Sequence, residues 1–254
     1  MKAVLQRMLA RRPLLYLRVL QAFGMGSAEK RMFLALLREG DVILDIGANR
    51  GQYTRLFSDI AGPLGAVHAF EPVPSTFAML TSAMEAAQGH ANFTLNNFAL
   101  GDAEGAAVLH LPGEDDGQAS MRRHEVGSWA GGVAVKSSEC RVKTLDGYAA
   151  GFQRLDFIKC DVEGAELLVI KGAAKTLDRL SPILFLEANP AWTKSFGYTP
   201  GDLVRELRKF GYDKIFVAGE KAVPFSETEI TGSVNLLCAK AELHAQRLRA
   251  LERV

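Results

Sequence analysis

The chain has 254 residues, 48% of them hydrophobic and 23% charged, with a formal net charge of +1. This length and composition are typical of one α/β domain with small additions, and they exclude a disordered, low-complexity or repeat protein. The near-neutral charge gives no general attraction to nucleic acid, so no nucleic-acid partner is expected. No stretch has the roughly 18 apolar residues of a membrane span, and the three dispersed cysteines indicate a reducing compartment. We therefore expect a cytoplasmic protein.

The first 22 residues contain five basic residues and no acidic one. At helical spacing, Arg7, Arg11 and Arg18 share one face. An apolar stripe lies nearly opposite them. Pro13 is expected to kink this helix or to split it in two. We assign residues 1–38 to an N-terminal helical arm with two open hypotheses. Its apolar stripe packs on the main domain or on a second subunit of a homo-oligomer, or its basic face docks on a membrane surface or an anionic carrier.

Residues 39–254 are predicted to form one α/β domain. A helix precedes it, capped by Ser27 and ending at Gly40. Five apolar runs of strand length then follow: 42–46, 66–70, 92–96, 156–160 and 183–187. Helical patterns separate most of them, over 52–60, 74–88 and 164–180. This alternation is typical of a mostly parallel sheet covered by helices on both faces. Two last strands, 212–219 and 232–240, are predicted to pair antiparallel and to close the sheet edge.

A polar, glycine-rich segment lies between the third and fourth of these strands. It follows one extra predicted strand, AAVLHLP, and the segment of interest spans residues 113–137. Long loops in compact domains are usually lids or disordered, and we predict a lid here. Its histidine, His124, is a further candidate for a general base, although a single loop histidine is usually solvated.

The stretch VILDIGANRGQYT, residues 42–54, runs from a strand directly into a glycine turn. A dinucleotide-binding turn usually has the pattern GxGxxG, whereas this turn has GxNxG, and no phosphate-binding GxxxxGK motif is present. The turn therefore suits a smaller zwitterionic ligand, and S-adenosylmethionine fits this description. The helix that begins after Gly51 would hold its carboxylate. Asp45 would accept from its ammonium, and Glu71, after the second strand, from the ribose hydroxyls.

A second acidic motif is LDFIKCDVEGAELLVIKGA, residues 155–173. Its strand brings Lys159, Asp161 and Glu163 to the carboxyl edge of the sheet, where open α/β sheets bind ligands. Glu166 follows in the next helix, where an acid is also favoured by the helix dipole. The fifth strand brings Glu187 to the same rim. Asp161, Glu163 and Glu187 could together hold a divalent metal, but their spacing alone leaves the metal unknown.

Five segments, in this order and spacing, resemble the FkbM-type S-adenosylmethionine-dependent methyltransferases: VILDIGANRGQYT, AFEPVPSTFAML, NNFALGD, LDFIKCDVEGAELLVIKGA and ILFLEAN. The resemblance covers roughly residues 40–220. It implies the Rossmann-like class I methyltransferase fold, which has a seven-stranded, mostly parallel sheet with a reversed C-terminal hairpin. It also implies methyl transfer to a hydroxyl of a small molecule, typically a sugar or a polyketide-type natural product.

The resemblance also implies roles for particular residues. Four would line the methionine end of the cofactor: Asp45, Gly47, Asn49 and Gly51. Glu71 would hold the ribose, and Asn97 would lie near the adenine. We expect Asp161 to be the general base that activates the acceptor hydroxyl, with Glu163 as the second candidate.

Two other classes of protein remain as alternatives. A nicotinamide-dependent oxidoreductase shares the strand, the turn and the acid after the second strand, but it should have GxGxxG. A non-catalytic subunit that keeps the cofactor fold would lose the acids after the fourth strand, whereas this chain keeps them.

Overall fold

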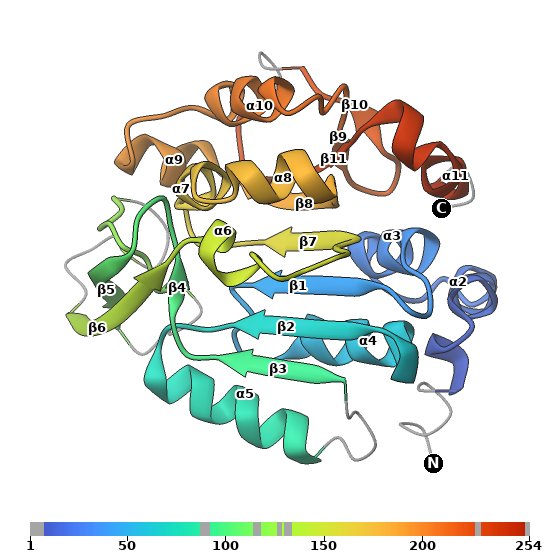
Figure 1. Ribbon diagram of the computed structural model, residues 1–254, viewed down its shortest axis with the longest axis horizontal. Coiled ribbons are helices and arrows are strands. Elements are labelled where there is room, and N and C mark those ends of the chain that lie inside the picture. Colours follow the sequence, from blue (N-terminus) through green and yellow to red (C-terminus); the bar gives the residue numbers. More distant parts are fainter. Residues whose placement is uncertain are drawn as a thin grey trace.

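The computed structural model describes residues 8–86, 92–113, 118–125, 129, 134–226 and 230–251. Within these residues an eight-stranded sheet forms the central layer, in the order β10-β9-β11-β8-β7-β1-β2-β3 (Figure 1). In that order the strands are β10 (Val223–Pro224), β9 (Lys214–Ala218), β11 (Val234–Ala239), β8 (Ile183–Ala188), β7 (Phe157–Cys160), β1 (Val42–Ile46), β2 (Ala66–Phe70) and β3 (Phe93–Asn96).

The strand directions confirm the predicted mixed sheet. Neighbouring strands from β8 to β3 pair in parallel, and β11 pairs antiparallel with both β8 and β9. The predicted antiparallel pair is therefore present, with β11 inserted between β8 and β9. The sheet has one strand more than the seven expected, because Val223 and Pro224 pair with the outer side of β9. A proline suits this edge, where its missing N–H faces no partner.

Helices cover both faces of the sheet, because the strand side chains alternate between two hydrophobic clusters. Ile43 of β1 belongs to the cluster shared with α3 (Ala28–Leu36), α4 (Gln52–Ala61) and α11 (Ala241–Leu251). Its neighbour Leu44 belongs to the cluster on the other face, shared with α7 (Glu166–Lys171), α8 (Ala174–Leu180) and α10 (Pro200–Lys209). The remaining helices are α5 (Pro74–Ala86), the 3₁₀ helix η1 (Gly62–Leu64), α6 (Leu145–Tyr148) and α9 (Pro190–Ser195).

Two predicted helices differ from those observed. The helix predicted over 164–180 is two helices, α7 and α8. A Cβ at Gly172, between them, would lie 1.9 Å from the backbone oxygen of Gly101, so this residue sits against a neighbouring chain segment. The helix capped by Ser27 ends at Leu36 rather than at Gly40, because Leu37 has an extended backbone.

The N-terminal arm packs on the domain. Pro13 occupies the first turn of α2 (Pro13–Ala22), after a short helical segment, so the arm is split as expected. Tyr16, Leu17 and Leu20 are buried in the same cluster as α3. The apolar stripe of α2 thus faces the main domain, while docking on lipid or on a second subunit stays a prediction. No helix in the described part of the chain is long and apolar enough to cross a membrane.

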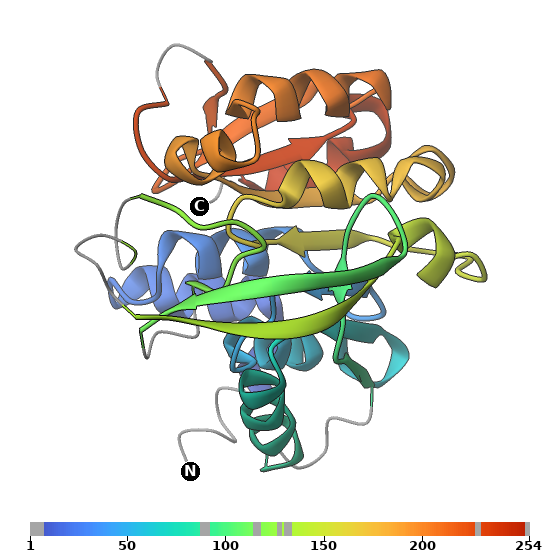
Figure 2. The same cartoon turned by 90° about the vertical axis from the view of Figure 1, so that its left-hand side faces the viewer.

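A second, three-stranded sheet lies across the carboxyl ends of the parallel strands, as Figure 2 shows, in the order β4-β6-β5 within the described residues. Its strands are β4 (Ala99–Leu100), β6 (Val135–Lys143) and β5 (Gly105–Pro112). The predicted extra strand is β5, and β6 takes up the last residues of the segment 113–137. Parts of that segment, 114–117, 126–128 and 130–133, lie outside the described residues, so the lid stays a prediction. The expectation that His124 is solvated is wrong, because its exposed fraction is 5%.

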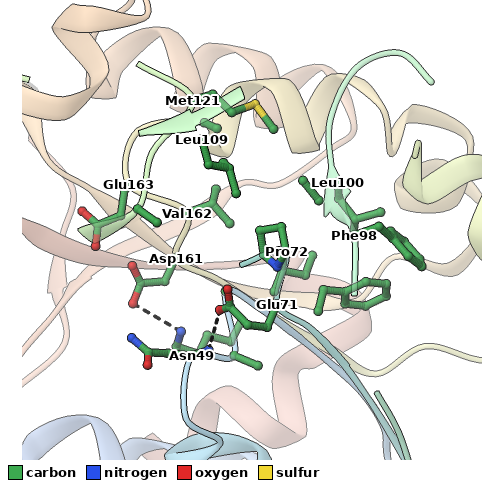
Figure 3. A pocket seen from close by; sticks show the side chains of 18 of the residues that line it. Asn49, Glu71, Pro72, Phe98, Leu100, Leu109, Met121, Asp161, Val162 and Glu163 are labelled. Carbon is green, nitrogen blue, oxygen red and sulfur yellow. Dashed lines mark hydrogen bonds and ion pairs between the residues drawn. The ribbon is translucent and has the colours of Figure 1, made fainter. Parts of the chain in front are cut away.

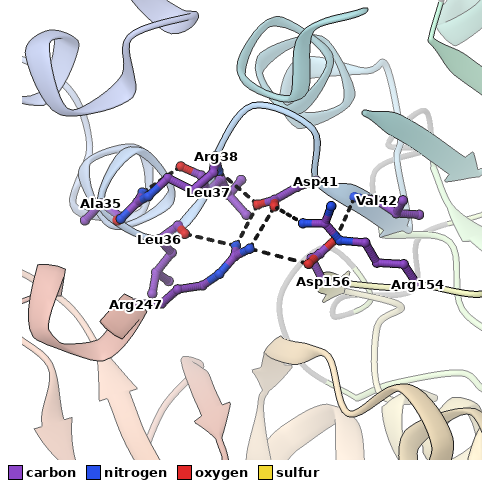
Figure 4. A network of polar contacts seen from close by, with 9 residues as sticks. All are labelled: Ala35, Leu36, Leu37, Arg38, Asp41, Val42, Arg154, Asp156 and Arg247. Atoms are coloured by element: carbon purple, nitrogen blue, oxygen red, sulfur yellow. Dashed lines mark hydrogen bonds and ion pairs between the residues drawn. The ribbon is translucent and has the colours of Figure 1, made fainter. Parts of the chain in front are cut away.

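A polar network fixes the C-terminal helix to the amino ends of two central strands (Figure 4). The fully buried carboxylate of Asp41 accepts two hydrogen bonds from the guanidinium of Arg247 on α11, at 2.6 and 2.8 Å. Arg154 lies 3.3 Å from Asp41 and 2.7 Å from Asp156, whose carboxylate also accepts from the Val42 amide at 2.9 Å. Since an unpaired buried charge is costly, the network stabilises this end of the sheet.

Replacing Arg247 with methionine removes the group that binds both oxygens of Asp41. We expect the free energy of unfolding to fall by about 2–4 kcal/mol, less than for a fully uncompensated charge because Arg154 remains. Urea denaturation measures the change. The matched control is Arg249→Met, at an exposed position of the same helix, which should cost less than about 0.5 kcal/mol. Equal losses in both variants would contradict the stabilising role of the network.

Candidate functional site

A cavity of about 350 Å³ lies at the carboxyl ends of β1, β2 and β7, below the second sheet (Figure 3). One wall comes from the glycine turn, 47–50, and a second from Glu71 and Pro72. A third comes from the loop after β7, and the second sheet and the segment that follows β5 contribute Leu109 and Met121. The cavity thus joins the two sequence motifs at the sheet edge where ligands of open α/β sheets bind.

The glycines of the turn have different structural reasons. Gly47 has a φ of +78°, and a Cβ there would lie 1.8 Å from the backbone oxygen of Asp161. Gly51 also has a positive φ, and a Cβ there would lie 2.7 Å from Leu80 on α5. Asn49 adopts the left-handed conformation that asparagine tolerates, with a φ of +49°. Gly47 and Asn49 line the cavity, whereas Gly51 packs against α5 outside the lining.

Glu71 is buried and its carboxylate is oriented by the backbone. Its two oxygens accept hydrogen bonds from the amides of Asn49, at 3.0 Å, and Val73, at 2.9 Å. These two bonds fix the orientation of the carboxylate at the cavity wall. Asn97 does not line the cavity, because its amide donates to the backbone oxygens of Glu71, at 2.9 Å, and Pro72, at 3.2 Å. It braces the loop that carries Glu71.

Lys159 lies between two carboxylates at the edge of the cavity. Its ammonium is 3.3 Å from Asp161 and 3.8 Å from Asp45. Burial alone would lower the pKa of Lys159, but the two carboxylates raise it above its ordinary value, so the lysine is charged.

Asp45 itself is fully buried and lies outside the cavity lining. One of its oxygens accepts from the Thr54 hydroxyl at 2.6 Å, and the other has no hydrogen-bond partner within the described residues. Burial raises the pKa of Asp45, against the opposing effect of Lys159. The Lys159 ammonium lies between Asp45 and Asp161.

The loop after β7 is held by a buried acid. Glu166, 1% exposed, accepts hydrogen bonds from the amides of Val162, at 2.9 Å, and Gly164, at 3.4 Å. The Tyr198 hydroxyl lies 3.2 Å from its other oxygen. Burial raises the pKa of Glu166 to about 7. Glu166 therefore organises the loop and does not line the cavity, while Asp161 and Glu163 do.

Asp161, Glu163 and Glu187 each place a carboxylate oxygen within 4.8 Å of the others. Burial, and then the neighbouring Asp161 and Glu166, raise the pKa of Glu187 to about 8. One Glu187 oxygen accepts from the Ser233 hydroxyl at 2.7 Å, and the other has no hydrogen-bond partner among the described residues. Three oxygen ligands suit a hard divalent cation. Such an ion stays a prediction.

The sequence reasoning missed Tyr53, which lines the cavity from the first turn of α4. Its hydroxyl binds Glu29 at the start of α3, and the Lys159 ammonium lies 5.5 Å from its ring centroid. Its position two residues after Gly51 could have indicated this role, because the first turn of a helix that follows a glycine turn faces the ligand. The contact with Glu29 joins residues 24 positions apart and has no local signature.

Comparison with known proteins gives the fold class and then the family. A solved structure of methyltransferase FkbM from Methylobacillus flagellatus superposes with a TM-score of 0.51 and 14% identity, over 84% of this chain and 55% of that one. This likeness, with the strand order described above, identifies the Rossmann-like class I methyltransferase fold. The sequence model of the methyltransferase FkbM domain matches residues 45–214, and the chain belongs to this family.

Two curated relatives have more specific names. The chain is 27% identical over 200 residues to the hexuronic acid methyltransferase AglP of Haloferax volcanii, and these residues make up 75% of each chain. It is 29% identical over 166 residues to the 2-O-methyltransferase NoeI of Sinorhizobium fredii, over 59% of this chain and 64% of the relative.

Replacing Glu187 with glutamine tests the electrostatic strain of the acidic rim. Because its folded pKa of about 8 exceeds the ordinary 4.5, the folded protein keeps a proton that the unfolded chain loses between these values. Stability is therefore lost as the pH rises from 4.5 to about 8. Glu187→Gln stays neutral, so it should raise the free energy of unfolding by roughly 1–3 kcal/mol near pH 9. Near pH 5 the substitution should change the free energy of unfolding little. Thermal denaturation at both pH values measures the two effects, and equal effects at pH 5 and pH 9 would contradict the prediction.

Proposed function

We propose that this chain is an S-adenosylmethionine-dependent O-methyltransferase that methylates a hydroxyl of a small molecule. The acceptor class we propose is a sugar or a glycosylated or polyketide-type natural product. The observation that carries the proposal is that Glu71, Asp161 and Glu163 line one cavity. Family membership supports methyl transfer. Glu71 supports binding of the cofactor, and Asp161 and Glu163 support activation of the acceptor hydroxyl.

The charge of the cavity favours S-adenosylmethionine over a nicotinamide dinucleotide. The lining contains three carboxylates, Glu71, Asp161 and Glu163, and two cations, Arg50 and Lys159. The sum is one negative charge, and buried Asp45 adds a second behind Lys159. S-adenosylmethionine carries a net positive charge, whereas a pyrophosphate would meet repulsion from these acids. The GxNxG turn supports the same choice.

The residues present fit the proposed cofactor in type. Glu71 would accept from the ribose hydroxyls, and Gly47 and Asn49 would border the methionine end. Phe98 and Leu100, which also line the cavity, offer an apolar wall for the adenine. Asn97 and Gly51 would act by shaping the walls rather than by contact. Asp45 would act as the counter-charge of Lys159.

The cofactor, when bound, supplies an activated methyl group, so this chain must position the acceptor and remove its proton. Asp161 is the proposed general base, because its partly exposed carboxylate lines the cavity and Lys159 holds it at 3.3 Å. Glu163, on the same loop, is the second candidate. The second sheet would exclude water from above, and orientation alone contributes about 7–11 kcal/mol in favourable cases.

The acceptor proposal rests on chemistry at the rim and on the named relatives. Glu163, beside the base, and the carboxyl group of Glu187, within 4.8 Å of it, would hydrogen-bond to neighbouring hydroxyls of a polyol. The relatives are named for a hexuronic acid substrate and for 2-O-methylation. An acceptor screen would therefore begin with methyl glycosides, whose neutral hydroxyls meet no repulsion from these acids, and would extend to uronic acids because of the name of the first relative.

The first test is a calorimetric titration with S-adenosylmethionine, with NADH in parallel. Glu71→Ala should weaken S-adenosylmethionine binding by about 1–3 kcal/mol, because hydrogen bonds to a charged group are lost. Glu85→Ala, at an exposed position of α5, is the matched control and should bind as the wild type does. A wild-type preference for NADH would overturn the cofactor proposal.

The second test concerns the base. Asp161→Asn should lower turnover by about 10²–10⁴-fold while S-adenosylmethionine affinity changes only a few-fold. Turnover is followed as S-adenosylhomocysteine release during the acceptor screen, with and without EDTA. Loss of wild-type activity in EDTA, restored by Mg²⁺, would assign the acids to a metal instead. Wild-type turnover in Asp161→Asn would remove Asp161 from the mechanism.

A further inference from the structure

Glu163 has an unusual backbone conformation. Its φ is +54°, one of three non-glycine residues with a positive φ in the described part of the chain. A long side chain is disfavoured in this region, and a residue held there is over-determined by its surroundings, frequently at a functional site. Contacts with neighbouring residues must therefore hold the peptide groups around Glu163 in place.

Two donors from the segment after β5 hold the carbonyl of Glu163. The Ser120 hydroxyl donates to this oxygen at 2.8 Å, and Nε2 of His124 lies 3.2 Å from it. Both residues belong to the segment predicted as a lid, about 40 residues away in sequence. Glu166 binds the amides on either side of Glu163 in the same loop. The peptide groups that flank the strained residue are therefore held from two directions.

The surroundings of His124 define its hydrogen on Nε2. The Ser195 hydroxyl lies 3.1 Å from Nδ1, so the ring accepts there and donates to Glu163. The ring packs against Trp192, with centroids 4.2 Å apart, and edge-on against Trp129, at 5.2 Å. Burial lowers the pKa of His124, in agreement with a neutral donor. Ser120 is equally enclosed, with 1% exposure.

We propose that Ser120 and His124 are positioning residues that fix Glu163 beside the reacting hydroxyl. The inference rests on the proposed function and deepens it. Residues 118–125, which carry them, are then an integral part of the active site. This segment also places Met121, which lies between Ser120 and His124 in sequence, on the cavity wall. The same two contacts thus couple the acceptor side of the cavity to the geometry of the loop after β7.

The choice of residue at position 163 supports a functional reason for the conformation. Glycine adopts a positive φ without a steric penalty, and the next residue, Gly164, has a φ of +98°. A glutamate in such a position costs stability that glycine would not, so its side chain must supply something else. Glu163 lines the cavity, and one of its carboxylate oxygens lies within 4.8 Å of a carboxylate oxygen of Asp161.

A mutant cycle on thermal stability tests the coupling without any acceptor. Glu163→Gly should raise the Tm in the wild-type background by relieving the backbone strain. In the His124→Ala background the loop is free to relax, so the gain should shrink by at least half. Independent, additive effects on the Tm would overturn the proposal.

Turnover and binding separate positioning from simple stability. With the best acceptor from the screen, His124→Ala should lower kcat by about 10²-fold, with S-adenosylmethionine affinity within about 2-fold of wild type. His124→Gln, which keeps a donor, should recover most of the loss. Ser120→Ala should act in the same direction, and the matched control is Ser137→Ala, an exposed serine of β6.

The outcomes distinguish the two proposals. Unchanged turnover in His124→Ala would overturn the positioning role. Failure of the wild type to bind S-adenosylmethionine would refute the proposed function, and the Tm cycle would still decide whether Ser120 and His124 hold Glu163. With no acceptor found, the Tm cycle alone decides.

Discussion

The close contact between Gly47 and the backbone oxygen of Asp161 is the constraint on which the rest of the site depends. Because Gly47 has no side chain, the turn after β1 and the loop after β7 can lie directly against each other. This contact brings the walls of the cavity together and places Lys159 between Asp45 and Asp161. A wider separation would open the space where the cofactor and acceptor are proposed to meet.

The site is a concentration of acids that is stable only through specific partners. Lys159 balances two carboxylates, while Glu166 is surrounded by amides and the Tyr198 hydroxyl. Glu187 has an oxygen with no hydrogen-bond partner among the described residues. Burial, and after it the crowding of these acids, raises the pKa values of Glu166 and Glu187. A cationic ligand would relieve it, so part of the binding energy would come from strain already present in the free protein.

Much of the fold could be predicted, because it follows from local patterns. The boundaries of β1 and β2 match the apolar runs, since polar or glycine residues end each run. The glycine turn of 42–54 and the acidic motif of 155–173 were also correctly placed at one sheet edge. Contacts between distant segments were not predictable: the burial of His124 and its bond to Glu163 depend on α9 and the second sheet. Likewise, strand alternation puts Asp45 under α4, which the motif alone does not reveal.

The place of β11 and Arg247 has a consequence for synthesis of the protein on the ribosome. β11 lies between β8 and β9, although it follows both in the chain, and Arg247 neutralises Asp41 at the start of β1. The growing chain therefore emerges with an incomplete sheet, in which Asp41 has Arg154 beside it but still lacks its two bonds from Arg247. Neither is corrected until residues 234–247 have left the exit tunnel. Folding of this domain is thus expected to finish only after β11 and α11 have emerged, with the edges of β8 and β9 exposed to chaperones until then.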